Sequence, residues 1–188
     1  GNPTSTLTNA VTVVVGTLYY VKIYSHSNNH GVACWKFGMA VMDAPVNDLC
    51  ANAITLTTAF NPAALTCTLK NATLNGTAIP TSCSTETPDV WYTFQATSVY
   101  PSIVLSATGT NFSTNGRIQL FSGSCGSLAN LACVTGNTLS TLATAAPLTV
   151  VTSYYVRIYS KISNPAGAGR NLGIAVMYST VTDLCANA

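Results

Sequence analysis

Charged side chains are scarce in this chain of 188 residues, which holds seven Lys and Arg and five Asp and Glu. They make up 6% of the sequence, whereas an ordinary domain carries about 25%. Because no basic cluster is present, the electrostatic footprint of nucleic-acid binding is missing, and we expect no nucleic-acid partner. No apolar run reaches the length of about 18 residues that a membrane span needs, so we expect no span in this segment.

Residues that could carry catalysis or bind metal ions are also few. The sequence has two His, no pair of Cys separated by two residues and no Gly-x-Ser-x-Gly motif, which argues against zinc and against a nucleophilic serine. Glu86 and Asp89 could act as glycosidase carboxylates, but they lie in one loop with no second acidic cluster. Asp48, Asp89 and loop carbonyls would suit calcium chemically. We expect no catalytic residue, no metal site and no cofactor, although the residues would allow calcium.

The chain repeats itself with a spacing of 135 residues. Val46–Ala53 (VNDLCANA) returns as Val181–Ala188 (VTDLCANA), and Tyr19–Ser25 (YYVKIYS) returns as Tyr154–Ser160 (YYVRIYS). A period of this length suits a whole domain and is too long for a solenoid repeat.

The repeat predicts three pieces of a tandem array: residues 1–45 are the C-terminal half of one copy, residues 46–181 are a complete copy, and residues 182–188 begin the next. Asp48 and Asp183 occupy the same position in two copies. This repetition predicts a structural role at the start of each domain, where an oxygen acceptor stabilises a cap or turn. The linker at Asp43–Val46 is short, so we expect neighbouring domains to lie close together.

The chain contains seven cysteines, which with the Thr-rich, charge-poor composition indicates an oxidising extracellular setting with disulfides. Cys125 and Cys133 close a nine-residue loop and are expected to pair. Cys50, Cys67 and Cys83 compete for one further bond, and Cys50–Cys67 is favoured. Cys83 is then either a free thiol or the partner of Cys34 across the domain junction.

Alternation of apolar and polar residues predicts strands along the whole chain, as at Tyr19–Ser25, and no segment shows a helical period. Gly123–Asn130 is expected to be a tight loop. The pattern of about nine short strands in the complete copy predicts an all-β, antiparallel, jelly-roll-like β-sandwich. The expected strands are Ala53–Thr58, Thr66–Thr73, Asp89–Ala96, Ser102–Thr108, Arg117–Ser122, Leu139–Ala143, Leu148–Val151, Tyr154–Ser160 and Leu172–Tyr178.

Asp89–Ala96 (DVWYTFQA) is the most aromatic of these segments, and we expect it to be a central strand. Val90, Tyr92 and Phe94 share one face and are the better core residues by size and polarity. Trp91 lies on the other face, where it covers an edge or a sheet face or stacks on a sugar ring.

These motifs together resemble a known module. The order NDLCANA, DVWYTF, IQLFSGSCGSL, LAC and YYVRIYS resembles a tandem β-sandwich repeat of large secreted and surface proteins of Bacteroidota. Many of these proteins look like type IX secretion cargo, including giant repetitive adhesins linked to gliding. The module is also similar to pre-peptidase C-terminal domains, which are β-sandwiches appended to secreted enzymes. The resemblance implies an extracellular or cell-surface location.

We therefore expect a non-enzymatic structural module of an extracellular repetitive surface protein or filament that serves adhesion or fibre formation. Its expected partners are neighbouring copies of itself. The alternative is a carbohydrate-binding or accessory module of a secreted hydrolase, with surface glycans as partners.

Overall fold

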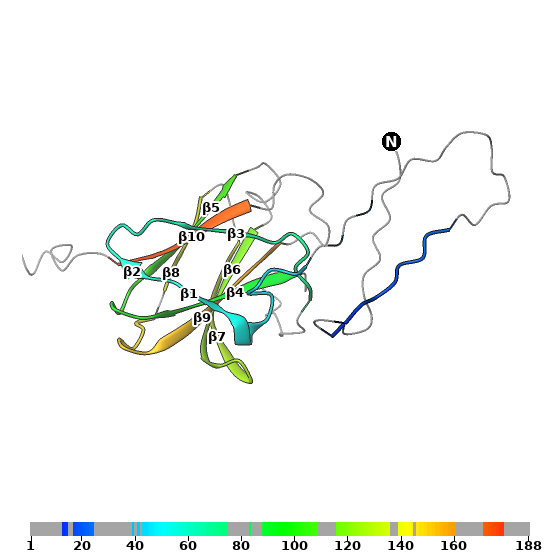
Figure 1. Cartoon of the computed structure of the whole chain (residues 1–188). Coiled ribbons are helices and arrows are strands. Elements are labelled where there is room, and N and C mark those ends of the chain that lie inside the picture. The colour runs from blue at the N-terminus through cyan, green and yellow to red at the C-terminus, as the bar shows by residue number, and fades with distance from the viewer. Residues whose placement is uncertain are drawn as a thin grey trace, which may run out of the picture. The chain divides into compact units, whose positions relative to one another are not determined.

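The computed structural model describes residues 13–14, 17–24, 39, 41, 43–74, 83, 88–108, 116–135, 139–144, 146–160 and 171–178. The chain divides into two compact units, Gly1–Ala40 and Val41–Ala188. The strands of the described part all belong to the second unit (Figure 1). Tyr19–Tyr24 in the first unit form no strand, so for these residues the strand predicted at Tyr19–Ser25 is wrong.

The second unit contains ten described strands and one short 3₁₀ turn, η1 (Cys50–Asn52). The strands are β1 (Ile54–Thr55), β2 (Thr58–Ala59), β3 (Leu65–Thr68), β4 (Asp89–Gln95), β5 (Ser102–Thr108), β6 (Gly116–Ser124), β7 (Ser127–Thr135), β8 (Leu139–Ala143), β9 (Ser153–Ser160) and β10 (Asn171–Met177). They form two sheets (Figure 1). Sheet A has the order β1-β4-β9-β6-β7; sheet B has the order β2-β10-β5-β8, and β3 also pairs with β10.

The predicted all-β sandwich is confirmed, and its strand pairs are antiparallel except for two. β1 pairs in parallel with β4, and β2 pairs in parallel with β10. Both exceptions arise because β1 and β2 are successive parts of one extended segment that passes from sheet A to sheet B at Leu56–Thr57. The Leu56 amide donates to the Thr93 carbonyl at 2.8 Å, and its side chain enters the core.

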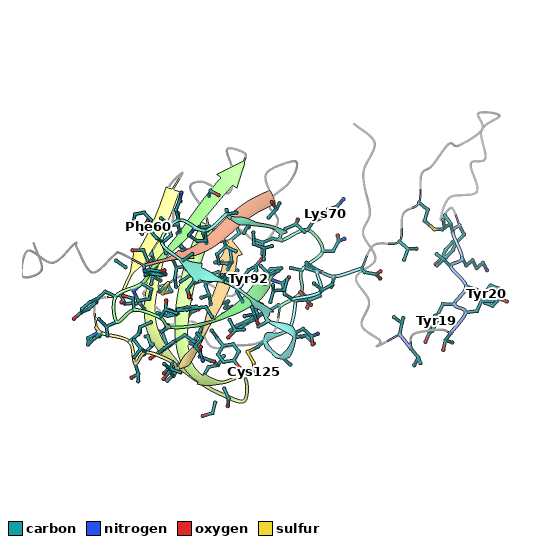
Figure 2. All side chains as sticks on the ribbon, turned by 60° about the vertical axis from the view of Figure 1, so that its left-hand side comes forward. Tyr19, Tyr20, Phe60, Lys70, Tyr92 and Cys125 are labelled. Atoms are coloured by element: carbon teal, nitrogen blue, oxygen red, sulfur yellow. A yellow bond between two sulfur atoms is a disulfide. The ribbon has the colours of Figure 1, made fainter. Side chains whose placement is uncertain are left out.

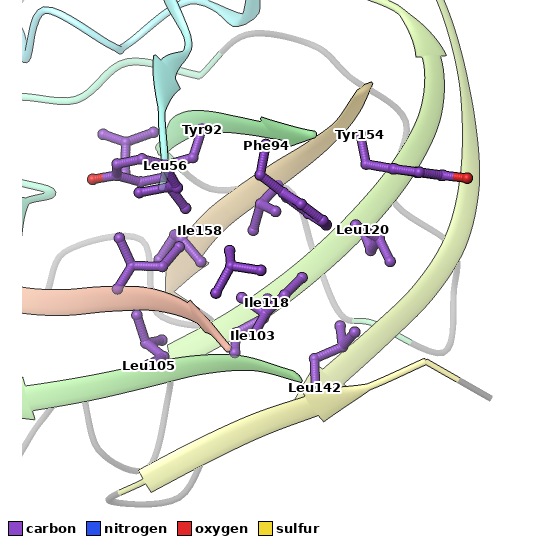
Figure 3. Packing of buried hydrophobic residues seen from close by; sticks show 14 of the residues in the cluster. Leu56, Tyr92, Phe94, Ile103, Leu105, Ile118, Leu120, Leu142, Tyr154 and Ile158 are labelled. Carbon is purple, nitrogen blue, oxygen red and sulfur yellow. The ribbon is translucent and has the colours of Figure 1, made fainter. Parts of the chain in front are cut away.

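The core fills the space between one face of each sheet (Figure 3). The predicted core face of β4 is confirmed, because Val90, Tyr92 and Phe94 are all buried. Alternate residues of the other long strands meet them, since side chains of a strand point to opposite faces with a period of two. The main contributors are Ile103, Leu105, Ile118, Leu120, Leu142, Tyr154, Val156, Ile158, Leu172, Ile174 and Val176. Each large apolar side chain buried in this way stabilises the fold by about 1.5–3 kcal/mol.

The chain enters and leaves the sandwich at opposite ends. At the entry, the Asn47 carbonyl accepts a hydrogen bond from the Trp91 amide near the start of β4. At the exit, β10 ends with Met177 paired to Ser102 at the start of β5. β4 runs directly into β5 through residues 96–101, so the start of β5 lies at the end of β4 that is far from the entry. Figure 1 shows β10 ending beside β2 at this exit end.

The hairpin of β6 and β7 departs from the sequence prediction. Ser127–Thr135 is a strand, although Gly123–Asn130 was expected to be a loop. β7 is an edge strand that pairs only with β6 within its sheet, so its small and polar residues give no clear apolar alternation. Gly123 has a φ of 95°, a left-handed conformation that favours glycine. The strand expected at Leu148–Val151 is a turn, where Val151 has a positive φ of 62°.

The disulfides also differ from the predicted pairs. Cys50 bonds to Cys125 and Cys83 bonds to Cys133, with Cα–Cα distances of 5.6 and 6.1 Å. Cys125 sits in the hairpin turn, and Cys133 lies eight residues farther along β7. At about 3.3 Å per residue the strand holds these two Cα atoms roughly 25 Å apart, whereas a disulfide requires less than about 7 Å. The predicted Cys125–Cys133 and Cys50–Cys67 pairs and the free or Cys34-bonded Cys83 are therefore wrong.

We expect a tryptic digest without reduction to separate the two disulfide patterns. Lys36, Lys70, Arg117 and Arg157 are consecutive cleavage sites, so peptide 118–157 carries both Cys125 and Cys133. The observed pairs join peptides 37–70, 71–117 and 118–157 into one species, which reduction splits into three. Release of peptide 118–157 by itself before reduction would contradict the observed pairs.

Candidate functional site

The outer face of sheet A carries a buried ion pair near the start of β4. Arg157 Nε donates to Asp89 Oδ2 at 2.7 Å, and Arg157 Nη2 lies against the same oxygen. Both side chains are fully buried. They come together because β4 and β9 are neighbours, with Trp91 directly opposite Arg157. A charge is tolerated at such depth only when it is paired and hydrogen-bonded.

Aromatic rings surround this ion pair and complete a buried layer made of Asp89, Trp91, Phe121, Arg157 and Tyr159, here called the outer layer. Trp91 Nε1 donates to Asp89 Oδ1 at 2.8 Å. The Arg157 guanidinium lies 5.7 Å from the centroid of the Trp91 ring and 5.0 Å from that of Tyr159. These distances allow cation–π attraction, which is strongest when water is excluded. The ring centroids of Trp91 and Phe121 are 5.6 Å apart.

Asn47 and Cys83 are hydrogen-bonded to residues of the outer layer. The backbone of Asn47 accepts from the Trp91 amide at 2.8 Å, and Asn47 Nδ2 donates to the Trp91 carbonyl at 2.9 Å. The Tyr159 hydroxyl donates to the Cys83 carbonyl at 3.1 Å. Trp91 has no exposed surface. The prediction that Trp91 stacks on a ligand is wrong, because a buried ring offers no face to a sugar.

The hydroxyl of Tyr159 is protonated in this setting. Burial raises the pKa of the phenol above its ordinary value, and the positive charges of Arg157 and Arg117 offset that rise only in part. A protonated hydroxyl is what the hydrogen bond to the Cys83 carbonyl requires. The hydrogen bond anchors Cys83 to β9, so we interpret the outer layer as structural.

Asp48 acts as an oxygen acceptor at the start of the domain, but its partner Thr73 lies 25 residues along the chain and not in the predicted cap or turn. Its carboxylate accepts from the Thr73 amide and from the Thr73 hydroxyl, each at 2.6 Å. The Thr73 carbonyl accepts from the Asp89 amide at 3.2 Å. Asp48 therefore ties the start of the domain to the segment after β3 and, through it, to β4.

The calcium site that the residues would allow finds no support in these contacts. The carboxylates of Asp48 and Asp89 both face N–H or O–H donors of the chain. Within the part of the chain that the structure describes, no three His, Cys, Asp or Glu residues gather as metal ligands. Cys34, Glu86 and Asp183 lie outside the described residues, whereas Cys67 lies within β3.

A shallow, open depression of about 510 Å³ lies on the outer face of sheet B, and it is the best candidate for a binding site. Ser102, Val104 and Thr141 form its floor from β5 and β8. They point outward because their neighbours Ile103, Leu105 and Leu142 point into the core. The rest of the lining is Phe60, Asn61, Met177 and Tyr178.

The lining suits a sugar chemically. Phe60 is 58% exposed and offers an aromatic face, while Asn61 and Thr141 offer hydrogen-bonding groups beside it. Figure 2 shows Phe60 at the edge of the sandwich and Tyr92 in its middle. Sequence reasoning missed Phe60. The one feature of the sequence that marks Phe60 is its position directly before Asn61-Pro62, a pair that favours a turn. The ring therefore belongs to no alternating strand pattern.

The comparisons with known proteins agree with this fold. A family model described as galactose binding domain-like, and associated with the type IX secretion system (T9SS), matches residues 46–172, about two thirds of the chain. No curated protein matches the sequence. The T9SS association and the two disulfides indicate a secreted or cell-surface β-sandwich module. In the described residues no helix is long and apolar enough to cross a membrane.

We expect the Asp89→Asn substitution to lower the free energy of unfolding by about 3–5 kcal/mol, because it removes the buried carboxylate charge that pairs with Arg157. Urea unfolding followed by tryptophan fluorescence measures this loss. Asp43→Asn is the matched control, since Asp43 is exposed, and its expected change is within about 0.5 kcal/mol. Equal stability of the two variants would show that the ion pair does not hold the outer layer.

Proposed function

Because the chain belongs to the galactose binding domain-like family associated with T9SS, we propose that it is a structural module of a repetitive extracellular surface protein or filament. The module acts without catalysis, as a spacer that carries adhesion or builds a fibre. Its partners are neighbouring copies of the same module.

The observation that carries this proposal is the placement of entry and exit at opposite ends of the sandwich. Asn47 contacts the backbone of Trp91 at one end, and β10 leaves beside the start of β5 at the other. Modules joined through such ends advance by at least the length of a sheet strand with each copy. The seven residues of β4 span roughly 23 Å at about 3.3 Å per residue. Tandem copies therefore favour an extended string over a compact cluster.

The sequence supports the same arrangement. The VNDLCANA motif at Val46–Ala53 recurs at Val181–Ala188, directly after the residues that follow β10. The chain carries few charges, so electrostatic repulsion between adjacent modules is weak. Exposed apolar residues at the exit end, among them Val99, Tyr100 and Val151, offer contact area to the following module.

Reduction followed by denaturing mass measurement of the native polypeptide tests the array. A mass far above 19.5 kDa is expected, because several modules then share one chain. A mass near that value would contradict a covalent array.

The two disulfides suit a module that bears tension between its ends. A pull on the chain before Cys50 passes through the Cys50–Cys125 bond and bypasses the residues between them. This bond spans a sequence separation of 75 residues, and the Cys83–Cys133 bond spans 50. An oxidised module therefore lengthens much less on unfolding than a reduced one. A fibre of oxidised modules consequently changes little in length when some of them unfold.

Single-molecule stretching from the two chain ends measures this effect. Reduction is expected to lengthen the unfolding step by the 75 residues behind Cys50–Cys125, or about 260 Å at roughly 3.5 Å per residue. In the oxidised Cys50→Ser/Cys125→Ser variant the remaining bond conceals 50 residues, or about 175 Å. A step length that does not change on reduction would contradict the load path.

A second candidate function is carbohydrate binding at the depression on sheet B. The specific observation in its favour is the exposed ring of Phe60 beside polar groups in a hollow of about 510 Å³. The galactose binding domain-like description of the family is compatible with it.

A glycan array probed with the full chain tests this second function. If it holds, Phe60→Ala weakens binding about tenfold or more, because stacking on an aromatic face is worth roughly 1–3 kcal/mol by analogy with other stacked rings. Tyr100→Ala is the matched control, since Tyr100 is 55% exposed and does not line the depression. Absence of binding to any glycan, or an equal loss in both variants, would leave the structural role as the better account.

A further inference from the structure

The N-terminal segment, residues 1–45, exposes side chains that a folded domain would bury. Tyr19 is 51% exposed, Val21 60% and Ile23 53%. Met39 and Val41 are also exposed, at 60% and 83%. Monomeric soluble proteins rarely leave alternating apolar residues of this kind uncovered, and such a pattern marks an interaction surface.

The same residues are buried where the sequence recurs. With the spacing of 135 residues, Tyr19, Val21 and Ile23 correspond to Tyr154, Val156 and Ile158 of β9. Those three residues are 5%, 0% and 0% exposed. Met39 and Val41 likewise correspond to Ile174 and Val176 of β10, both fully buried.

One local contact is already the same in both places. The ammonium of Lys22 lies 5.8 Å from the centroid of the Tyr24 ring. At the equivalent positions, the guanidinium of Arg157 lies 5.0 Å from the centroid of Tyr159. Lys22 thus presents a positive charge at the position where β9 meets Asp89 of β4.

The neighbours of β9 and β10 identify what covers the N-terminal segment. β9 lies between β4 and β6, and β10 pairs with β5 on one side and with β2 and β3 on the other. All five neighbouring strands come from residues 58–124 of the complete copy. The N-terminal segment contains the counterparts of the two central strands and none of the counterparts of their neighbours.

We propose that Tyr19–Ser25 and Phe37–Met42 are the central strands of a second sandwich, completed by a segment equivalent to Val46–Thr135 that precedes Gly1 in the same polypeptide. Tyr19–Ser25 lies between the equivalents of β4 and β6. Phe37–Met42 lies between the equivalents of β5 and β3. This inference rests on the proposed tandem array. It assigns residues 1–45 to the copy that precedes the complete one.

Intact copies of the module cannot supply this partner. In the complete copy β9 and β10 already occupy both central positions. The N-terminal segment therefore needs a copy whose own central strands are absent, and the stretch before Gly1 meets this condition when the repeat continues in register. Thr135 precedes Gly136, the counterpart of Gly1, so the junction needs no added linker.

A fusion in which Val46–Thr135 is placed directly ahead of Gly1 of the full chain tests the proposal by amide hydrogen exchange. We expect residues 19–24 to exchange at least about 1,000-fold more slowly in the fusion than in the unextended chain, because their amides enter two sheet ladders. Residues 154–159 report whether the original sandwich is folded in both proteins. Unchanged exchange at residues 19–24, with residues 154–159 protected, would overturn the proposal.

A matched pair of variants separates core insertion from non-specific collapse. In the fusion, Val21→Asp is expected to abolish protection of residues 19–24, since its counterpart Val156 is fully buried. Tyr20→Asp is expected to retain it, since its counterpart Tyr155 is only partly buried on the outer face. In the unextended chain Val21→Asp is expected to leave the melting temperature unchanged. Loss of protection in both fusion variants, or in neither, would contradict insertion as β9.

A second protein keeps the test decisive if the fusion does not fold. In this chimera Gly136–Thr180 of the chain is replaced by Gly1–Pro45, a segment of equal length. Cooperative unfolding with both disulfides formed is expected, and failure of the fusion and the chimera together would overturn the proposal. The array itself fails separately: a native mass near 19.5 kDa with protection in the fusion would show that the N-terminal segment can complete a sandwich, but would overturn the claim that a preceding segment of the same polypeptide does so.

Discussion

The central position of the last two strands governs this fold. β9 and β10 lie in the middle of sheets A and B, yet they follow every one of their hydrogen-bonding neighbours in the chain. The sheets cannot close, and the core between them cannot exclude water, until residues 153–177 are in place. Such non-local pairing means that the loops must close before the contacts that stabilise them can form.

Sheet A is buried on both of its faces at the start of β4. Two of the few charged side chains of the chain form an ion pair there. Asp89 and Arg157 neutralise each other where water is absent, and Trp91 and Tyr159 contribute hydrogen bonds and ring faces to the same layer. Cys50, close to Asn47, is bonded to Cys125 in the turn of the β6–β7 hairpin, and Cys83 is bonded to Cys133 of β7. Disulfides across such long loops stabilise chiefly by restricting the unfolded chain.

The surface and the ends of the module fit the same interpretation. Few charges and a disulfide-stapled interior suit a secreted β-sandwich of the galactose binding domain-like family. The depression around Phe60 lies at the exit end, because β2 ends beside the last residues of β10.

The sequence alone determined the sandwich class, most of the long strands and the inward face of Val90, Tyr92 and Phe94, because period-two alternation is a local property of the chain. It also showed that the VNDLCANA motif recurs after 135 residues. Tertiary structure alone decided the partners of Cys125 and Cys133, the burial of Trp91 and the exposure of Phe60 in a hollow. Each of these depends on which distant segments lie against a strand, and residue spacing along the chain carries no such information.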